Sequence, residues 1–129
     1  MGKIDIQYIY NKFEEETDMK VAIVGSRGLN IDISRFIPSE VTEIISGGAK
    51  GIDISAEQYA DSHFIPKRII RPDYSRYGRA APLKRNEQIV EAADIIIAFW
   101  DGQSKGTKYT IQYARKIGKP IKVFMSESN

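Results

Sequence analysis

The 129-residue sequence predicts an α/β fold: an open, doubly wound, mostly parallel sheet of five strands with helices on both faces, in three layers. Two patterns predict this fold. Short apolar runs alternate with segments of helical periodicity along most of the chain, and several of the runs end at glycine or proline turn signals. Right-handed crossovers between the strands then give the strand order 3-2-1-4-5.

The strands are expected where the apolar runs are short. Lys20–Val24 is followed by Gly25 and is typical of a buried parallel strand. Ile95–Phe99 is the most apolar run, so we expect it near the centre of the sheet. The complete set of expected strands is 20–24, 41–46, 66–70, 95–99 and 120–124.

Helices are expected between these strands, at 31–37, 52–64, 82–93 and 107–118. In the second of them, apolar residues recur at helical spacing. Pro82 suits the first turn of the third. Thr107 is placed to cap the fourth helix, which would end at Gly118. Residues 73–81 are expected to form a basic loop that carries tyrosines.

Residues 1–18 are interpreted as an N-terminal arm or an added edge element, and residues 19–129 as the domain itself. Ile4, Ile6 and Tyr8 alternate as in a strand, whereas Phe13 and the glutamates that follow it suit a helical turn. This segment stands outside the alternating pattern of the domain.

Composition excludes several classes of protein. There are no cysteines and one histidine, His63, so we expect no disulfide framework and no metal site. The chain has no long apolar stretch and no signal-like N-terminus, which predicts a cytoplasmic protein without a membrane partner. The net charge of +2 does not predict nucleic-acid binding, but basic residues gather between 67 and 85, as a local anionic ligand would require.

Three glycine-bearing loops follow expected strands, at 25–28, 47–51 and 102–107. Because the carboxyl ends of parallel strands meet at one edge of the sheet, these loops should converge there. Glycine permits close backbone approach, and helix N-termini attract anions. The expected ligand contacts in the loops are Gly25, Ser26, Arg27, Gly47, Gly48, Lys50, Gly51, Gly102, Ser104, Gly106 and Thr107. Neither G-x-G-x-x-G nor the P-loop pattern is present.

The segment 73–86 adds further candidates to this edge. Arginine suits phosphate and tyrosine can stack on a base. Arg79, Arg85 and Asn86 are therefore expected ligand contacts. Candidate catalytic residues are Asp53, Arg85 and Glu87, while Asp101 is expected only to end a strand.

Four segments of the sequence resemble a known family: V-A-I-V-G-S-R at 21–27, S-G-G-A-K-G-I-D at 46–53, Y-G-R-A-A-P-L-K-R-N at 77–86 and G-T at 106–107. They look like the SLOG superfamily, and more closely its small DUF2493 or YspA-like members, over residues 19–125. The resemblance implies a Rossmann-like fold that binds or senses nucleotides or their derivatives. The superfamily includes the DNA-processing protein DprA, which shares the pattern at 46–53, and the LOG or lysine-decarboxylase-like phosphoribohydrolases.

The LOG enzymes use an arginine near a helix start, which Arg85 matches, and a glutamate where this chain has Thr110. We therefore expect a binding module for a small phosphorylated, nucleotide-like molecule, with no required cofactor. The alternatives are a nucleotide N-glycosidic hydrolase using Asp53 or Glu87, and single-stranded DNA binding, although nucleic acid is not the expected partner. A homo-oligomer, dimeric or larger, stays open.

Overall fold

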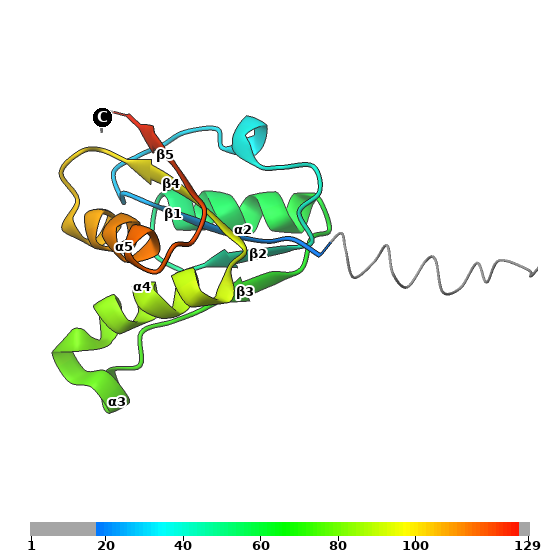
Figure 1. Cartoon of the computed structure of the whole chain (residues 1–129). Helices are drawn as coiled ribbons and strands as arrows, with labels where there is room; N and C mark the ends of the chain where they lie inside the picture. The colour runs from blue at the N-terminus through cyan, green and yellow to red at the C-terminus, as the bar shows by residue number, and fades with distance from the viewer. Residues whose placement is uncertain (1–17, 127–129) are drawn as a thin grey trace, which may run out of the picture.

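The computed structural model describes residues 18–126, so the expected arm falls outside the described residues except for Asp18. Five parallel strands form one sheet in the order β3-β2-β1-β4-β5, as predicted (Figure 1). The strands are β1 (Lys20–Gly25), β2 (Glu43–Ser46), β3 (Lys67–Ile69), β4 (Ile95–Trp100) and β5 (Ile121–Met125).

Helices cover both faces of the sheet, which confirms the three-layer, doubly wound architecture. Figure 1 shows α4 and α5 together on one side of the sheet and α2 on the other. The helical elements are η1 (Ser34–Phe36), α2 (Ile52–Ser62), α3 (Tyr74–Tyr77), η2 (Gly78–Ala80), α4 (Ala81–Ala92) and α5 (Lys105–Lys116).

The two apolar cores follow from the two-residue period of the strands. In β1, Val21 and Ile23 pack toward α2 and η1, while Ala22 and Val24 pack toward α4 and α5. All four are buried because β1 lies at the centre of the sheet. Strands buried on both faces explain why the sequence shows continuous apolar runs rather than alternation.

Three local predictions differ from the structure in detail. The helix expected at 31–37 is only the single turn η1, because the Asp32 side chain accepts hydrogen bonds from the backbone N–H and hydroxyl of Ser34 and competes with a longer helix. The fourth helix begins at Lys105 with Ser104 at its N-cap, so Thr107 lies inside it. The expected basic loop at 73–81 contains the short helices α3 and η2.

The topology brings together the loops that matter for the site. β1 pairs with β4 in a parallel register that sets Gly25 beside Phe99. The chain leaves these two strands in opposite directions along the sheet, and such a switch point is where open α/β sheets form ligand crevices. Across residues 18–126, no helix has the length and apolar character needed to cross a lipid bilayer.

Candidate functional site

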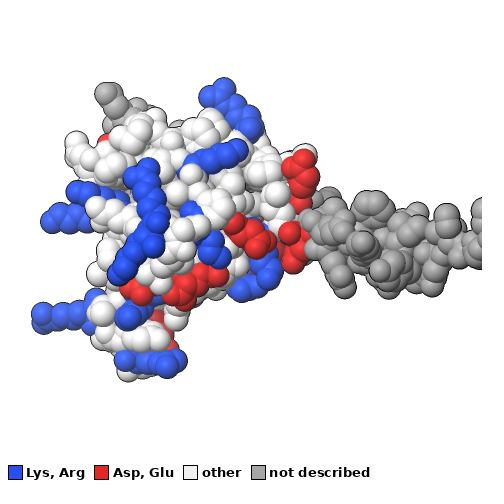
Figure 2. Space-filling view, viewed as in Figure 1, with Lys and Arg blue, Asp and Glu red and all other residues white. Residues whose placement is uncertain are grey.

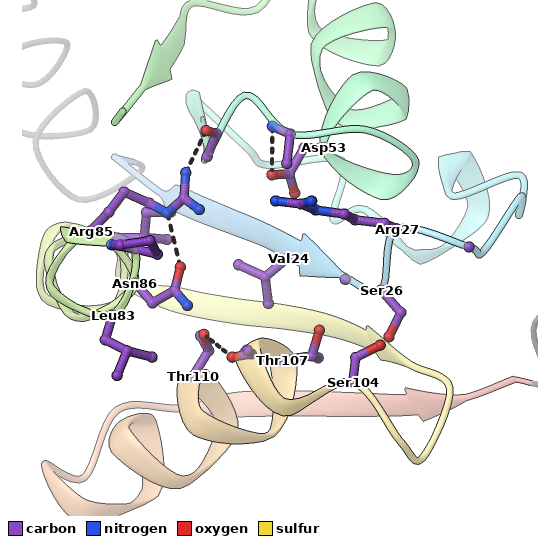
Figure 3. A pocket seen from close by; sticks show the side chains of 17 residues that line it. Val24, Ser26, Arg27, Asp53, Leu83, Arg85, Asn86, Ser104, Thr107 and Thr110 are labelled. Atoms are coloured by element: carbon purple, nitrogen blue, oxygen red, sulfur yellow. Dashed lines mark hydrogen bonds between the residues drawn. The ribbon is translucent and has the colours of Figure 1, made fainter. Parts of the chain in front are cut away.

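A cavity of about 350 Å³ opens at the carboxyl edge of the sheet. It lies between the loops after β1 and β2 and the first turns of α4 and α5 (Figure 3). The expected ligand contacts that line it are Gly25, Ser26, Arg27, Gly47, Arg85, Asn86, Ser104, Gly106 and Thr107. Asp53, a candidate catalytic residue, lines it as well.

The other expected contacts do not line this cavity: Gly48, Lys50, Gly51, Arg79 and Gly102. A Cβ atom on Gly48 would meet Ile69 and Arg71, which shows that this glycine faces the outer strand β3. Gly51 has a φ of +76° and its Cα packs against the backbone of Arg27. Gly48 and Gly51 shape the loop that carries Gly47 and Ala49.

The cavity also has an apolar wall that was not predicted from the sequence, made by Val24, Pro82, Leu83 and Ile89. Pro82, Leu83 and Ile89 lie on α4 at helical spacing from Asn86, which is the signal that could have found them. Ala49 and Gly28 also line the cavity.

Arg85 connects α4 to the loop after β2. Its Nη1 donates a hydrogen bond of 2.6 Å to the carbonyl oxygen of Gly47, and its Nε donates one of 2.9 Å to Asn86 Oδ1 (Figure 3). Burial lowers the pKa of Arg85, an effect that Asp53 opposes. An arginine always carries its charge, so these contacts hold a cation in place at the cavity wall.

Asn86 is oriented by the same contact. Because its Oδ1 accepts from Arg85, its amide nitrogen is left to donate. If Gly106 carried a Cβ atom, this amide nitrogen would be its nearest neighbour, at 3.9 Å. The nitrogen therefore lies beside the start of α5. Asn86 therefore adds a donor next to the first turn of that helix.

The start of α5 is held by Asp101. Its Oδ1 accepts hydrogen bonds from the backbone N–H groups of Ser104 and Gln103, at 2.7 and 2.8 Å. Its Oδ2 accepts one from the Ser104 hydroxyl. These bonds lower the pKa of Asp101 to about 2. Asp101 N also donates to Ser26 Oγ, so the loops after β1 and β4 form one unit.

α5 presents its first turn to the cavity. The first helical hydrogen bond runs from Lys108 N to Ser104 O, which leaves the preceding N–H groups without a helical partner. Such a helix end attracts anions. The Thr110 hydroxyl donates a hydrogen bond of 2.9 Å to the carbonyl oxygen of Gly106. The hydroxyl of Thr107, which also lines the cavity, has no hydrogen-bond partner within residues 18–126.

Asp53 is the one carboxylate among the described residues that line the cavity. Its Oδ2 accepts a 3.0 Å hydrogen bond from Ala49 N, which closes the loop at 47–51. Burial is the main cause of the raised pKa of Asp53, while the Ala49 hydrogen bond and the charges of Arg85 and Arg27 lower it.

Glu87 does not line the cavity and faces α5 instead. It accepts a hydrogen bond from the Tyr109 hydroxyl at 2.7 Å and pairs with Lys84 at 3.7 Å. In the part of the chain that the structure describes, no three acidic or histidine side chains converge to hold a metal ion.

The cavity is therefore rich in hydrogen-bond donors. Arg27, Arg85, Asn86 and the α5 terminus supply them, and Asp53 is the opposing acidic group. Figure 2 shows Lys and Arg side chains projecting from the side of the molecule that bears this edge. Such an arrangement can bind an anion with several oxygens and hold an apolar group against the wall.

Comparisons with known proteins agree with the fold. The structure is similar to that of DNA processing protein A from Helicobacter pylori, whose single-stranded DNA binding mode has been described, with a TM-score of 0.64 and 21% identity over 88% of this chain and 70% of that one. This similarity shows a shared Rossmann-like fold.

No family model matches the sequence. One curated protein, the Gene 61 protein of Mycobacterium phage D29, is 32% identical over 84 residues, which cover 60% of this chain and 67% of that protein. An identity of this level over two thirds of the relative indicates common descent. The chain belongs to the family of this phage protein.

Proposed function

We propose that the cavity binds or senses a small phosphorylated ligand of nucleotide type. The observation that carries the proposal is the Arg85 guanidinium, held by Gly47 O at 2.6 Å beside the open N-terminus of α5. A fixed guanidinium and unpaired helical N–H groups are the donors that phosphate oxygens prefer. We further propose that the chain is a SLOG protein of the DUF2493 or YspA-like group, on the motifs at 21–27, 46–53, 77–86 and 106–107.

The size of the cavity favours a single nucleotide. At about 350 Å³ it lies near the lower end of the range for small-molecule pockets. Arg27, Arg85, Asn86 and the start of α5 supply the donors, and Val24, Leu83 and Ile89 supply an apolar wall. In the proposed mode the phosphate meets the donors, and the less polar part of the ligand packs on the wall.

Binding is favoured over hydrolysis by the position of the carboxylates. Glu87 is engaged by Tyr109 and Lys84 outside the cavity, and the position three residues after Thr107 is Thr110, whose hydroxyl is used by Gly106 O. Asp53 is then the remaining candidate acid, and one of its oxygens closes the loop at 47–51.

A calorimetric titration with nucleoside mono- and diphosphates tests the proposal. The Arg85→Ala variant should lose affinity at least tenfold, because a charge-assisted contact contributes about 1.5–3 kcal/mol. Arg79→Ala removes a cation from η2, outside the cavity, and serves as the matched control. Equal losses in both variants, or unchanged affinity in Arg85→Ala, would place binding elsewhere.

Single-stranded DNA is a second candidate ligand, favoured by the likeness in fold to DNA processing protein A. Arg27 and Arg85, the cationic side chains that line the cavity, are compatible with a phosphate backbone. Fluorescence anisotropy with a labelled oligonucleotide at rising salt tests this, because each released counterion steepens the salt dependence. If a mononucleotide displaces the oligonucleotide, the two share the cavity.

A further inference from the structure

Asp53 is an unusual residue for a phosphate-binding cavity. Asp53 is 8% exposed and lines the cavity. Oδ2 is used by Ala49 N, but within residues 18–126 Oδ1 has no hydrogen-bond partner. Oδ1 is therefore an accessible carboxylate oxygen without a partner among these residues, in a cavity that Arg27, Arg85 and Asn86 also line.

This carboxylate opposes the binding of a bare anion. Like charges repel more strongly at a partly buried site than in water. A carboxylate oxygen can only accept hydrogen bonds, so its desolvation is offset when a donor of the ligand meets it. The ligand that fits this cavity best carries a donor as well as a phosphate.

The Asp53 carboxylate and the Arg85 guanidinium are close neighbours. A Cβ atom on Gly47 would lie 3.0 Å from Asp53 Oδ2 and 2.8 Å from Arg85 Nη1, so both groups flank the same Cα. The ligand's donor must then lie near its phosphate. In a nucleotide the group next to the phosphate is the sugar, whose hydroxyls are donors, whereas the base lies further away.

We infer that the ligand is a ribosyl phosphate, and that Asp53 Oδ1 selects it by accepting a hydrogen bond from a sugar hydroxyl. This inference rests on the proposed function, and it names the class of ligand. It assigns Asp53 to specificity, in addition to its contact with Ala49 N.

The test compares adenosine 5′-monophosphate, 2′,3′-dideoxyadenosine 5′-monophosphate, ribose 5-phosphate and inorganic phosphate by calorimetry. The wild-type protein should bind the first about tenfold or more tightly than the dideoxy compound, since a hydrogen bond to a charged group is lost. Ribose 5-phosphate should also bind more tightly than inorganic phosphate, which shows that the sugar rather than the base supplies the donor.

Asp53→Asn separates specificity from loop structure. The asparagine carbonyl can still accept from Ala49 N, while the charge is removed. Inorganic phosphate should bind the variant more tightly than wild type, and the ratio between the two nucleotides should fall toward one. Arg79→Ala, which removes a cation outside the cavity, should leave that ratio unchanged.

Each contrary result has a distinct meaning. Equal affinity of the wild type for the two nucleotides overturns the role of Asp53 without any variant. A variant that loses the same factor for phosphate and for both nucleotides shows that Asp53 only holds the loop, and this also overturns the inference. If the wild type binds none of the four phosphates, the proposed function itself fails.

Discussion

The hydroxyl of Tyr109 on α5 donates a 2.7 Å hydrogen bond to Oε2 of Glu87 on α4, and so joins the two helices whose first turns form walls of the cavity. The residues that precede Glu87, Arg85 and Asn86, line the cavity, and so does Thr110, which follows Tyr109. A second bond of the same kind joins Tyr113 to Glu91, one turn further from the cavity on both helices.

The two bonds form a matched pair for mutation. Tyr109→Phe should weaken ligand binding several-fold, because the spacing between Arg85 and the α5 terminus is no longer fixed next to the cavity. Tyr113→Phe removes an equivalent bond and should lower the melting temperature without a comparable loss of affinity. Calorimetry with the tightest nucleotide, together with thermal melting, distinguishes the two effects. Identical affinities in the two variants would rule out a positioning role for Tyr109.

Gly51 should tolerate no side chain. Its φ of +76° disfavours any L residue, and a Cβ would lie 2.5 Å from the carbonyl oxygen of Arg27. Gly51→Ala should therefore cost more than the roughly 1–3 kcal/mol of backbone strain alone. Gly118 has the same φ, but a Cβ there would meet no atom within 4 Å. Gly118→Ala should therefore show the backbone strain alone. Urea unfolding of both variants gives the comparison, and equal losses would contradict it.

Asp101 should stabilise the fold only above acidic pH. Hydrogen bonds from the N–H groups of Ser104 and Gln103 lower its pKa from 3.8 to about 2. Since the folded pKa lies below the unfolded one, this stabilisation is present above pH 4 and is lost as the pH falls toward 2. Asp101→Asn should melt below wild type at neutral pH, and the gap should close between pH 4 and 2. A gap that stays constant over this range would show that titration of Asp101 is not involved.

Thr110 offers a direct test of charge in the cavity. Its side chain is buried at the lining, so Thr110→Glu would introduce a second carboxylate into the cavity that Asp53 lines. The affinity for nucleoside monophosphates should fall at least tenfold by repulsion. Thr110→Val keeps the volume without the charge, and it should bind nearly as wild type does. A glutamate variant that binds as tightly as the valine variant would place the phosphate away from α5.

The fold could be predicted because its strands are distinct in sequence. β1 and β4 are continuous apolar runs buried on both faces, and parallel strands with right-handed crossovers leave few topologies. Helix ends were less predictable, since they depend on local side-chain contacts such as those of Asp32 with Ser34 and Asp101 with Ser104.

The candidate site could be predicted only at the level of loops. Parallel topology brings strand ends together, so Ser26, Gly47 and Gly106 were expected at one edge. Which glycine of a pair faces the cavity depends on backbone dihedrals: Gly48, at φ +72°, faces Ile69 and Arg71, whereas Gly47 faces Arg85 and Asp53. No sequence pattern encodes this difference.

The residues that line the cavity come from segments that are far apart in the sequence, so the ribosome makes them at different times. Its lining begins at Val24 and ends at Thr110, and α5 supplies one complete wall. A nascent chain that has emerged only as far as β4 lacks that wall and the donors of its first turn. Ligand occupancy would therefore distinguish finished molecules from incomplete ones, and it would add to the cooperativity of folding by linking the first strand of the sheet to its last helix.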